Sequence, residues 1–159
     1  MKNQKKIFGI VLSLLAFAYV AFVFNANADE TVKIKWLTIE EAQELSKKEP
    51  KKIFVDVFAV WCGPCKKMDQ VTFRDPKVVE YVNKNYYAVK LDAESARKIT
   101  YKGKKMTETE LAMAVFQVQA YPTIVFLEND FSNHVSAIGY QPADKFESML
   151  KEFQEGKVK

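Results

Sequence analysis

The hydrophobic positions of this chain follow two patterns from residue 32 onward. Short apolar runs rich in β-branched and aromatic residues alternate with segments whose apolar residues recur every three or four positions. The first pattern is typical of buried strands and the second of amphipathic helices. Strands are predicted at 32–36, 53–60, 86–91, 123–127 and 135–138. Helices are predicted at 38–48, at 66–73 with a restart through 85 that Asp75 caps and Pro76 begins, at 107–116 and at 146–153.

Local signals support several of these boundaries. Thr38 with Glu41 and Thr107 with Glu110 have the spacing of capping boxes, which begin helices. The segment 93–106 is polar and is expected to be a loop with a turn near 102–104. The resulting order β-α-β-α-β-α-β-β-α predicts an α/β protein with a central mixed sheet of four to five strands, flanked on both faces by about four helices.

The N-terminal segment has a different pattern. Three lysines within residues 1–6 precede an uncharged apolar run at 7–24, and Ala26-Asn27-Ala28 provides small residues for cleavage. These features predict a secretory signal peptide at 1–28, followed by one domain at 29–159. The run of 18 residues is also just long enough to remain as an uncleaved membrane anchor. Either alternative places the domain outside the cytoplasm.

Removing the leader changes the charge of the chain. The whole sequence has 24 basic and 20 acidic residues, and the leader contributes three lysines and no acid, so the remainder is 21 minus 20, or about +1. A nearly neutral domain gives no reason to expect nucleic-acid binding. The basic residues between 97 and 105 are interpreted as a solvated loop.

The two cysteines, Cys62 and Cys65, are the main chemical feature. A disulfide across two residues closes too short a loop to stabilise a fold strongly. A structural zinc site normally needs four ligands, and the lone His134 does not complete one, so no metal is expected. His134 is expected at the surface. Redox chemistry is the remaining interpretation, with the Cys62–Cys65 disulfide itself as the redox group and no separate cofactor.

The cysteine pair lies between a predicted buried strand and a helix. Unpaired N–H groups at a helix N-terminus favour a thiolate, so Cys62 is the expected nucleophile. Cys65, one turn later, is the expected resolving cysteine, which attacks the mixed disulfide. Gly63 offers no side-chain hindrance, and Pro64 favours the backbone angle of the first helical turn.

Two charged residues interrupt apolar strands. Burial of Asp56 would be costly and would raise its pKa, and its place six residues before Cys62 suggests a buried proton acceptor for Cys65. The alternative is a carboxylate that faces solvent at a sheet edge. Lys90, in the next apolar strand, is a candidate partner of Asp56; an exposed lysine is the alternative.

The motif in its context resembles the thioredoxin family. The stretch 55–66, with Trp61 before the cysteine pair, is similar to the thioredoxin active-site sequence, and 89–92, 121–123 and Gly139 also match. The stretch 72–79 is similar to the periplasmic domain of transmembrane disulfide reductases. The resemblance implies a thioredoxin fold, a cis bond before Pro122 with this proline against the cysteines, and pairing of the Tyr121 backbone with an extended substrate.

Two departures accompany the resemblance. The segment between Lys90 and Pro122 is longer than in thioredoxins, and Tyr121 replaces a small aliphatic residue. The expected function is a monomeric thiol–disulfide oxidoreductase that reduces exported proteins, supplied by a membrane-bound electron donor, in a compartment such as the bacterial periplasm. A disulfide oxidase or isomerase and a non-catalytic binding module are the alternatives.

Overall fold

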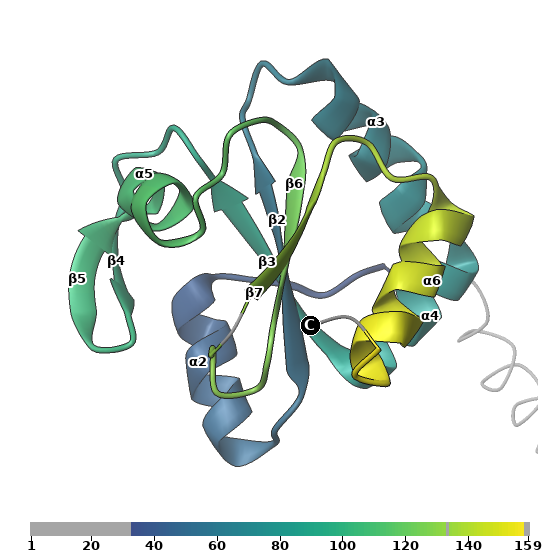
Figure 1. The fold of residues 1–159 in the computed structure, drawn as a ribbon, viewed down its shortest axis with the longest axis horizontal. Helices are drawn as coiled ribbons and strands as arrows, with labels where there is room; N and C mark the ends of the chain where they lie inside the picture. The colour runs from purple at the N-terminus through teal and green to yellow at the C-terminus, as the bar shows by residue number, and fades with distance from the viewer. Residues whose placement is uncertain (1–32, 133, 158–159) are drawn as a thin grey trace, which may run out of the picture. The chain divides into compact units, whose positions relative to one another are not determined.

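A computed structural model describes residues 33–132 and 134–157, and Figure 1 shows a central sheet with helices on both faces. The predicted leader at 1–28 lies outside the described residues. Among the residues described, no helix is long and apolar enough to cross a membrane. The sheet strands are β1 Trp36–Leu37, β2 Lys52–Phe58, β3 Tyr86–Asp92, β6 Thr123–Leu127 and β7 His134–Ile138; the α-helices are α2 Ile39–Lys48, α3 Gly63–Gln70, α4 Pro76–Asn85, α5 Glu108–Glu110 and α6 Ala143–Gln154.

The sheet is mixed, with the strand order β1-β3-β2-β6-β7. β1, β3 and β2 run parallel, whereas β6 is antiparallel to both β2 and β7. β2 therefore occupies the middle of the sheet, which explains why its residues are buried on both faces. In this register Asp56 lies opposite Lys90 on β3 and Ile124 on β6.

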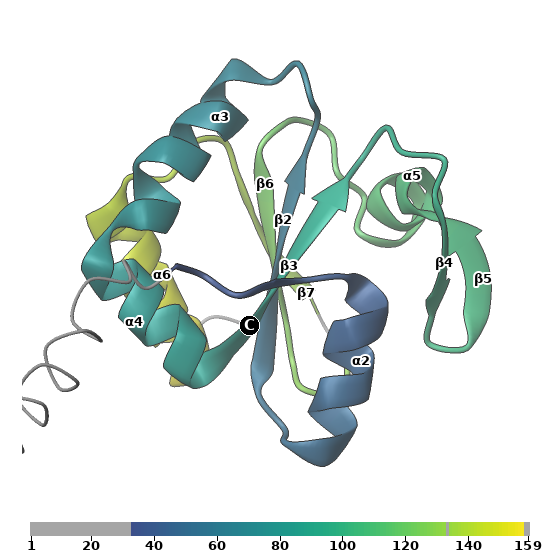
Figure 2. The same cartoon turned by 180° about the vertical axis from the view of Figure 1, so that it is seen from behind.

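Helices cover the two faces of the sheet unequally. α3, α4 and α6 pack against one face, and α2 and α5 lie on the other, as Figure 2 shows from behind. Alternation along β2 assigns its side chains to the two faces: Phe54 packs toward α3, α4 and α6, whereas Val55 packs toward α2. Phe54 is fully buried and contacts the ring of Phe146 edge-to-face at 5.3 Å.

The predicted caps are present. The Thr38 and Thr107 side chains each accept a hydrogen bond from the backbone N–H of the glutamate three residues later, and each glutamate carboxylate accepts one from the threonine backbone N–H. Asp75 caps α4 by accepting from two backbone N–H groups of its first turn. These side chains satisfy donors that a helix end leaves unpaired, so the sequence placed these helix starts correctly.

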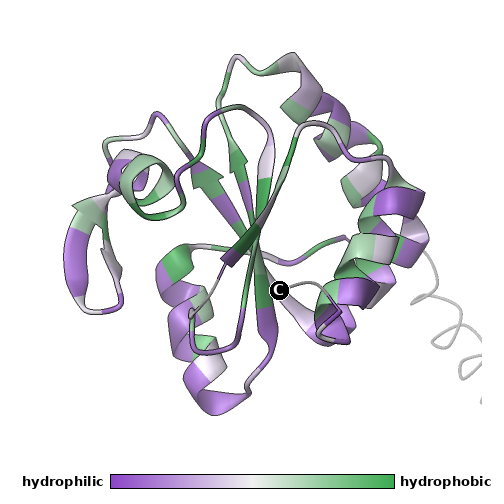
Figure 3. Ribbon diagram, viewed as in Figure 1, coloured by the Kyte–Doolittle hydropathy of each residue, from purple (hydrophilic) through white to green (hydrophobic). Residues whose placement is uncertain are grey.

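The turn expected near 102–104 is present, but the expectation of a polar loop throughout 93–106 was wrong. Part of it forms a two-stranded hairpin, β4 Lys98–Tyr101 and β5 Lys104–Thr107, and the ribbon of β5 is mostly hydrophilic in Figure 3. Alternate burial of Ile99 and Tyr101 fixes β4 to the domain. The Gln43 side chain also donates to the Thr100 carbonyl at 2.8 Å and accepts from the Lys102 backbone N–H at 2.8 Å.

Three predicted elements have different boundaries. The first strand contains only Trp36–Leu37, because the Asn83 side chain bonds the Lys33 carbonyl and the Lys35 N–H instead. The helix expected to reach residue 73 ends at Gln70 and is followed by a 3₁₀ turn at 72–74. The helix expected at 107–116 is a short α-turn followed by a π-turn at 111–115. Five α-helices are therefore described rather than four.

Candidate active site

The cysteine pair lies where the central strand β2 leads into α3. Cys62 is the N-cap of α3, and the Cys65 N–H donates to the Cys62 Sγ at 3.1 Å. The two Sγ atoms are joined in a disulfide with a Cα–Cα separation of 5.3 Å. Each cysteine is only 2% exposed. The pair therefore occupies a helix N-terminus, where backbone N–H groups favour a negatively charged sulfur.

The two residues between the cysteines lie in the first turn of α3. Pro64 occupies a first-turn position, where its missing N–H group costs no helical hydrogen bond. A β-carbon added at Gly63 would meet no heavy atom within 4 Å. The packing of the domain itself therefore does not require glycine here, and the open space remains available to a partner chain.

Aromatic residues border the cysteine pair. Trp61 is 67% exposed, and its ring meets that of Tyr121 edge-to-face at 5.9 Å. Its Nε1 donates a hydrogen bond to Glu94 Oε2 at 2.8 Å. Tyr121 also packs, with Phe58, against the small buried cluster that contains the cysteines. The sequence analysis did not identify Glu94, which follows β3 in a segment predicted to be a loop.

Pro122 immediately precedes β6, and the peptide bond from Tyr121 to Pro122 is cis, as the family resemblance implies. The Pro122 carbonyl accepts a hydrogen bond from the Gly139 N–H at 2.7 Å. Gly139 has φ of +86°, a backbone angle that suits glycine. The hydrogen bond between Gly139 and Pro122 thus joins the end of β7 to the start of β6.

Asp56 lies in the middle of the central strand and is 1% exposed, so a solvent-facing position at a sheet edge is wrong. It shares the sheet face of Phe54, which α3 covers. Burial raises the pKa of Asp56 to about 6, against a lowering by Lys90. One carboxylate oxygen, Oδ1, is buried without a hydrogen-bond partner. Asp56 therefore changes protonation close to neutral pH.

Lys90 is the partner of Asp56. Its Nζ lies 2.6 Å from Asp56 Oδ2 and also contacts the Asp69 carboxylate. The same ammonium lies over the ring of Trp36 at 4.7 Å. The alternative of a purely exposed lysine is wrong, because this side chain joins two carboxylates and an aromatic surface.

Asp69 was missed by the sequence analysis. It lies in α3, four residues after Cys65, so the two side chains share one face of the helix. Its negative charge contributes to the raised pKa of Asp56. The four-residue spacing from Cys65 was the available signal, but one aspartate in an amphipathic helix is ordinary.

The remaining candidates lie away from the cysteine pair. His134 is exposed on the outermost strand β7, where its ring meets that of Phe116. The exposed basic residues of 97–105 lie on or next to the β4–β5 hairpin. Arg97 among them is tied to Glu108 at 2.9 Å.

Comparison with known proteins gives consistent results. Residues 39–154 match the model of the thioredoxin-like domain family. A thioredoxin of Borreliella burgdorferi is 28% identical over 126 residues, covering 79% of this chain and 92% of that protein. The thiol:disulfide interchange protein DsbD of Haemophilus influenzae is 27% identical over 126 residues, covering 75% of this chain and 20% of DsbD.

A solved structure is also similar to this chain in sequence and fold. The putative disulphide-isomerase of Bacteroides thetaiotaomicron is 31% identical, covers 79% of this chain and 93% of its own, and superposes with a TM-score of 0.56.

The sheet order and the cysteine pair at the start of α3 define a thiol–disulfide oxidoreductase of the thioredoxin fold. The chain belongs to the thioredoxin-like domain family. It is accordingly a protein disulfide oxidoreductase. The chain spans about a fifth of DsbD, so the activity of that whole protein does not transfer with the match.

Proposed function

We propose that the chain reduces disulfides of exported proteins through the Cys62–Cys65 dithiol. The observation that carries the proposal is the cysteine pair at the N-terminus of α3, above a sheet face that contains the buried Asp56. The helix start favours a Cys62 thiolate, and Asp56 has a pKa of about 6, suited to accepting a proton near neutral pH.

The reaction has two exchange steps. The Cys62 thiolate attacks one sulfur of the partner disulfide, which forms a mixed disulfide and releases the other partner sulfur as a thiolate that takes up a proton. Cys65 then loses its proton and attacks the Cys62 sulfur, which releases the second partner thiolate. Two electrons pass to the partner, and the enzyme is left with its Cys62–Cys65 disulfide. The redox group is this cysteine pair, without a separate cofactor.

Asp56 is the proposed proton acceptor for Cys65 in the second step. Its sheet face is covered by α3, the helix that carries Cys65. Lys90 supports this role, because its ammonium at 2.6 Å stabilises the carboxylate form against the cost of burial. Without the lysine, Asp56 would stay protonated at higher pH and could not accept a proton.

The groove for the partner is proposed to lie along Tyr121 and Pro122. Tyr121 packs against the cysteine cluster, and the bond to Pro122 is cis. The Tyr121 backbone would pair with an extended partner segment and bring its disulfide to Cys62. Trp61, beside it, presents an exposed indole to the same partner.

The reducing direction and the location belong to the proposal as well. The predicted leader at 1–28 would place the domain outside the cytoplasm, in a compartment such as the periplasm. An exported reductase needs a supply of electrons, and the similarity to one fifth of DsbD supports a membrane-bound donor. The Gly63-Pro64 pair resembles that of reducing thioredoxins, whose potential is near −270 mV.

Two measurements test this function. Equilibration in glutathione buffers should give a reduction potential well below −150 mV, whereas a value above about −150 mV would remove the reductase direction. Cys65→Ser should trap mixed disulfides on Cys62 in cells, and a Cys62→Ser, Cys65→Ser double variant should trap none. Recovery of no adduct with Cys65→Ser would contradict the exchange mechanism.

An isomerase or oxidase is the second candidate, favoured by the 31% identity to a putative disulphide-isomerase. Refolding of a scrambled disulfide protein in a redox buffer separates the two activities. An isomerase would restore native pairings at a rate that exceeds its net reduction of disulfides. A non-catalytic binding module would instead retain full biological activity in the double cysteine variant.

A further inference from the structure

The surface beside Cys62 carries a large exposed side chain that is nevertheless held in place. Trp61 is 67% exposed, yet its Nε1 donates to Glu94 at 2.8 Å and its ring contacts Tyr121 edge-to-face. An indole that is fixed on two sides loses little conformational entropy when a partner contacts it. The arrangement therefore favours Trp61 as a preformed contact surface next to the reacting sulfur.

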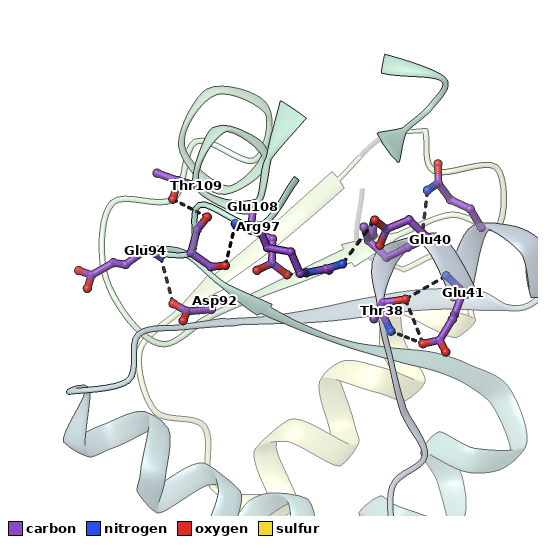
Figure 4. A network of polar contacts seen from close by, with 11 residues as sticks. Thr38, Glu40, Glu41, Asp92, Glu94, Arg97, Glu108 and Thr109 are labelled. Atoms are coloured by element: carbon purple, nitrogen blue, oxygen red, sulfur yellow. Dashed lines mark hydrogen bonds and ion pairs between the residues drawn. The ribbon is translucent and has the colours of Figure 1, made fainter. Parts of the chain in front are cut away.

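Glu94 is fixed by the segment that follows β3. The Ala93 N–H donates to the Phe58 carbonyl at 2.9 Å, which attaches this segment to the end of β2. The Glu94 N–H donates to Asp92 Oδ1 at 3.1 Å. Figure 4 shows the Glu94 side chain directed away from the polar cluster around Arg97. The carboxylate is thus presented to the surface beside Trp61.

Among the residues that the structure describes, no basic side chain forms an ion pair with Glu94. Arg97, the nearest arginine in the sequence, bonds Glu108 at 2.9 Å and Glu40 at 3.5 Å (Figure 4). Within residues 33–132 and 134–157, Glu94 and Asp92 take part in no ion pair.

Two further observations concern the charges around this surface. Burial raises the pKa of Tyr121, and the charges of Glu94 and Asp92 raise it further, so both carboxylates act on this side of the groove. The lysines next to the motif, Lys66 and Lys67, belong to α3, and Lys67 lies over the Tyr140 ring. The surface between Trp61 and Glu94 therefore combines an exposed aromatic ring with an unmatched carboxylate.

We propose that Trp61, Tyr121 and Glu94 form a subsite for a lysine or arginine that flanks the partner's disulfide. A cation over the indole face gains a cation–π attraction, and Glu94 can accept a charge-assisted hydrogen bond from it. An apolar side chain would instead remove water from the carboxylate without replacing its hydrogen bonds. The substrate class is a disulfide bordered by basic residues. This inference rests on the proposed function, because it assigns substrate preference to the same site.

The test compares two disulfide-closed peptides that differ at one position beside a cysteine, with lysine or with norleucine. The full chain, reduced beforehand, is mixed with each peptide, and the second-order rate of peptide reduction is measured by rapid quench. Each rate is divided by the rate with dithiothreitol, which removes intrinsic differences between the two disulfides. The wild type should reduce the lysine peptide about tenfold faster, and 0.5 M salt should diminish this ratio.

The matched variant is Glu94→Gln, which keeps an acceptor for Trp61 Nε1 but removes the charge. The ratio of its rates with the lysine and norleucine peptides should fall to about twofold or less, because the charge that favours lysine is gone. Glu80→Gln, an exposed glutamate on α4, changes the net charge equally and should keep the full preference. Trp61 fluorescence reports whether the indole environment survives in Glu94→Gln.

The same peptides in dithiol form, mixed with the oxidised chain, separate the two proposals. The lysine preference should appear in this direction too, because the subsite contacts the side chain and not the disulfide. Failure to reduce either peptide, with the preference kept in peptide oxidation, would overturn the reductase direction and support the subsite. The subsite would be overturned if the lysine and norleucine peptides reacted equally fast in both directions. It would also be overturned if Glu94→Gln left the lysine preference unchanged.

Discussion

Two buried carboxylates, Asp56 and Glu108, lie on opposite sides of the sheet, and each forms an ion pair with a basic side chain. Asp56 lies on the face covered by α3 and contacts Lys90 at 2.6 Å. Glu108 begins α5 on the other side and contacts Arg97 at 2.9 Å. Both carboxylates are less than 10% exposed. By burial and partner alone, the two ion pairs look alike.

The pKa shifts of Asp56 in one pair and of Arg97 in the other separate the two ion pairs. Burial raises the pKa of Asp56 to about 6 in spite of Lys90, and its Oδ1 has no hydrogen-bond partner. In the other pair, the hydrogen bond to Glu108 raises the pKa of Arg97, so the charged form is favoured. The Glu108 pair therefore anchors the segment after β3, whereas Asp56 is held close to losing its charge beside the cysteine motif. Similar ion pairs can thus serve structure in one place and proton transfer in another.

The largest expected effect is on stability as a function of pH. The pKa of Asp56 is higher in the folded chain than its ordinary value of 3.8, so the folded state binds the proton more tightly. Its contribution to stability is therefore complete below about pH 4 and is lost as pH rises through about 6. A gap of about two pH units corresponds to about 3 kcal/mol.

Urea unfolding of the oxidised protein between pH 4 and pH 8 measures this loss. The disulfide keeps the cysteines from titrating, and Asp56→Asn supplies the reference without a carboxylate. Relative to that variant, the wild type should lose about 3 kcal/mol over this range. Parallel curves for the two proteins would remove the contrast between Asp56 and Glu108.

The next effect is on the exchange reaction. Asp56→Asn removes the proposed acceptor, so attack by Cys65 on the mixed disulfide should slow by about a hundredfold at pH 7. Lys90 keeps Asp69 as a partner in this variant, which limits indirect damage. Single-turnover quenching should then show accumulated mixed disulfide on Cys62. A rate within twofold of the wild type would remove Asp56 from the mechanism.

The sequence revealed Asp56 and Lys90 because each is a charge within an apolar strand, an unusual pattern with few explanations. Asp69 gave no such signal, since polar residues are ordinary in an amphipathic helix and its contact with Lys90 depends on how α3 packs on the sheet. Glu94 depends likewise on the path of the chain after β3.

The helix starts were predictable because capping is local, with both hydrogen-bond partners within three residues. The β4–β5 hairpin was not, because each strand has four residues and only two of those in β4 are buried. Its attachment through Gln43 joins residues 57 positions apart, a contact that no local pattern contains. Local signals therefore gave the main sheet and the motif, but not the segment that shapes the surface beside them.

A smaller effect is expected at the structural pair. Glu108→Gln removes the charge that meets Arg97 but keeps a side chain of the same shape. Because the Arg97 side chain is 42% exposed, the loss should be about 1 kcal/mol, below the cost of breaking a fully buried pair. Urea unfolding measures it, with Glu80→Gln as the exposed control, and disulfide reduction should stay within twofold. A fall in the rate of disulfide reduction well beyond twofold, in protein that remains folded, would give this pair a part in catalysis.

The smallest effect is expected at Asp69. Its charge helps to raise the pKa of Asp56, so Asp69→Asn should lower that pKa by a fraction of a pH unit and leave Lys90 to Asp56 alone. Carboxyl carbon NMR titration of Asp56 reports the change directly, and the acid limb of the rate profile should move to lower pH with it. Asp144→Asn, which removes an exposed charge on α6, should move neither. An unchanged Asp56 titration in Asp69→Asn would mean that burial and Lys90 alone set the pKa of Asp56, and that the charge of Asp69 adds nothing to the contrast with Glu108.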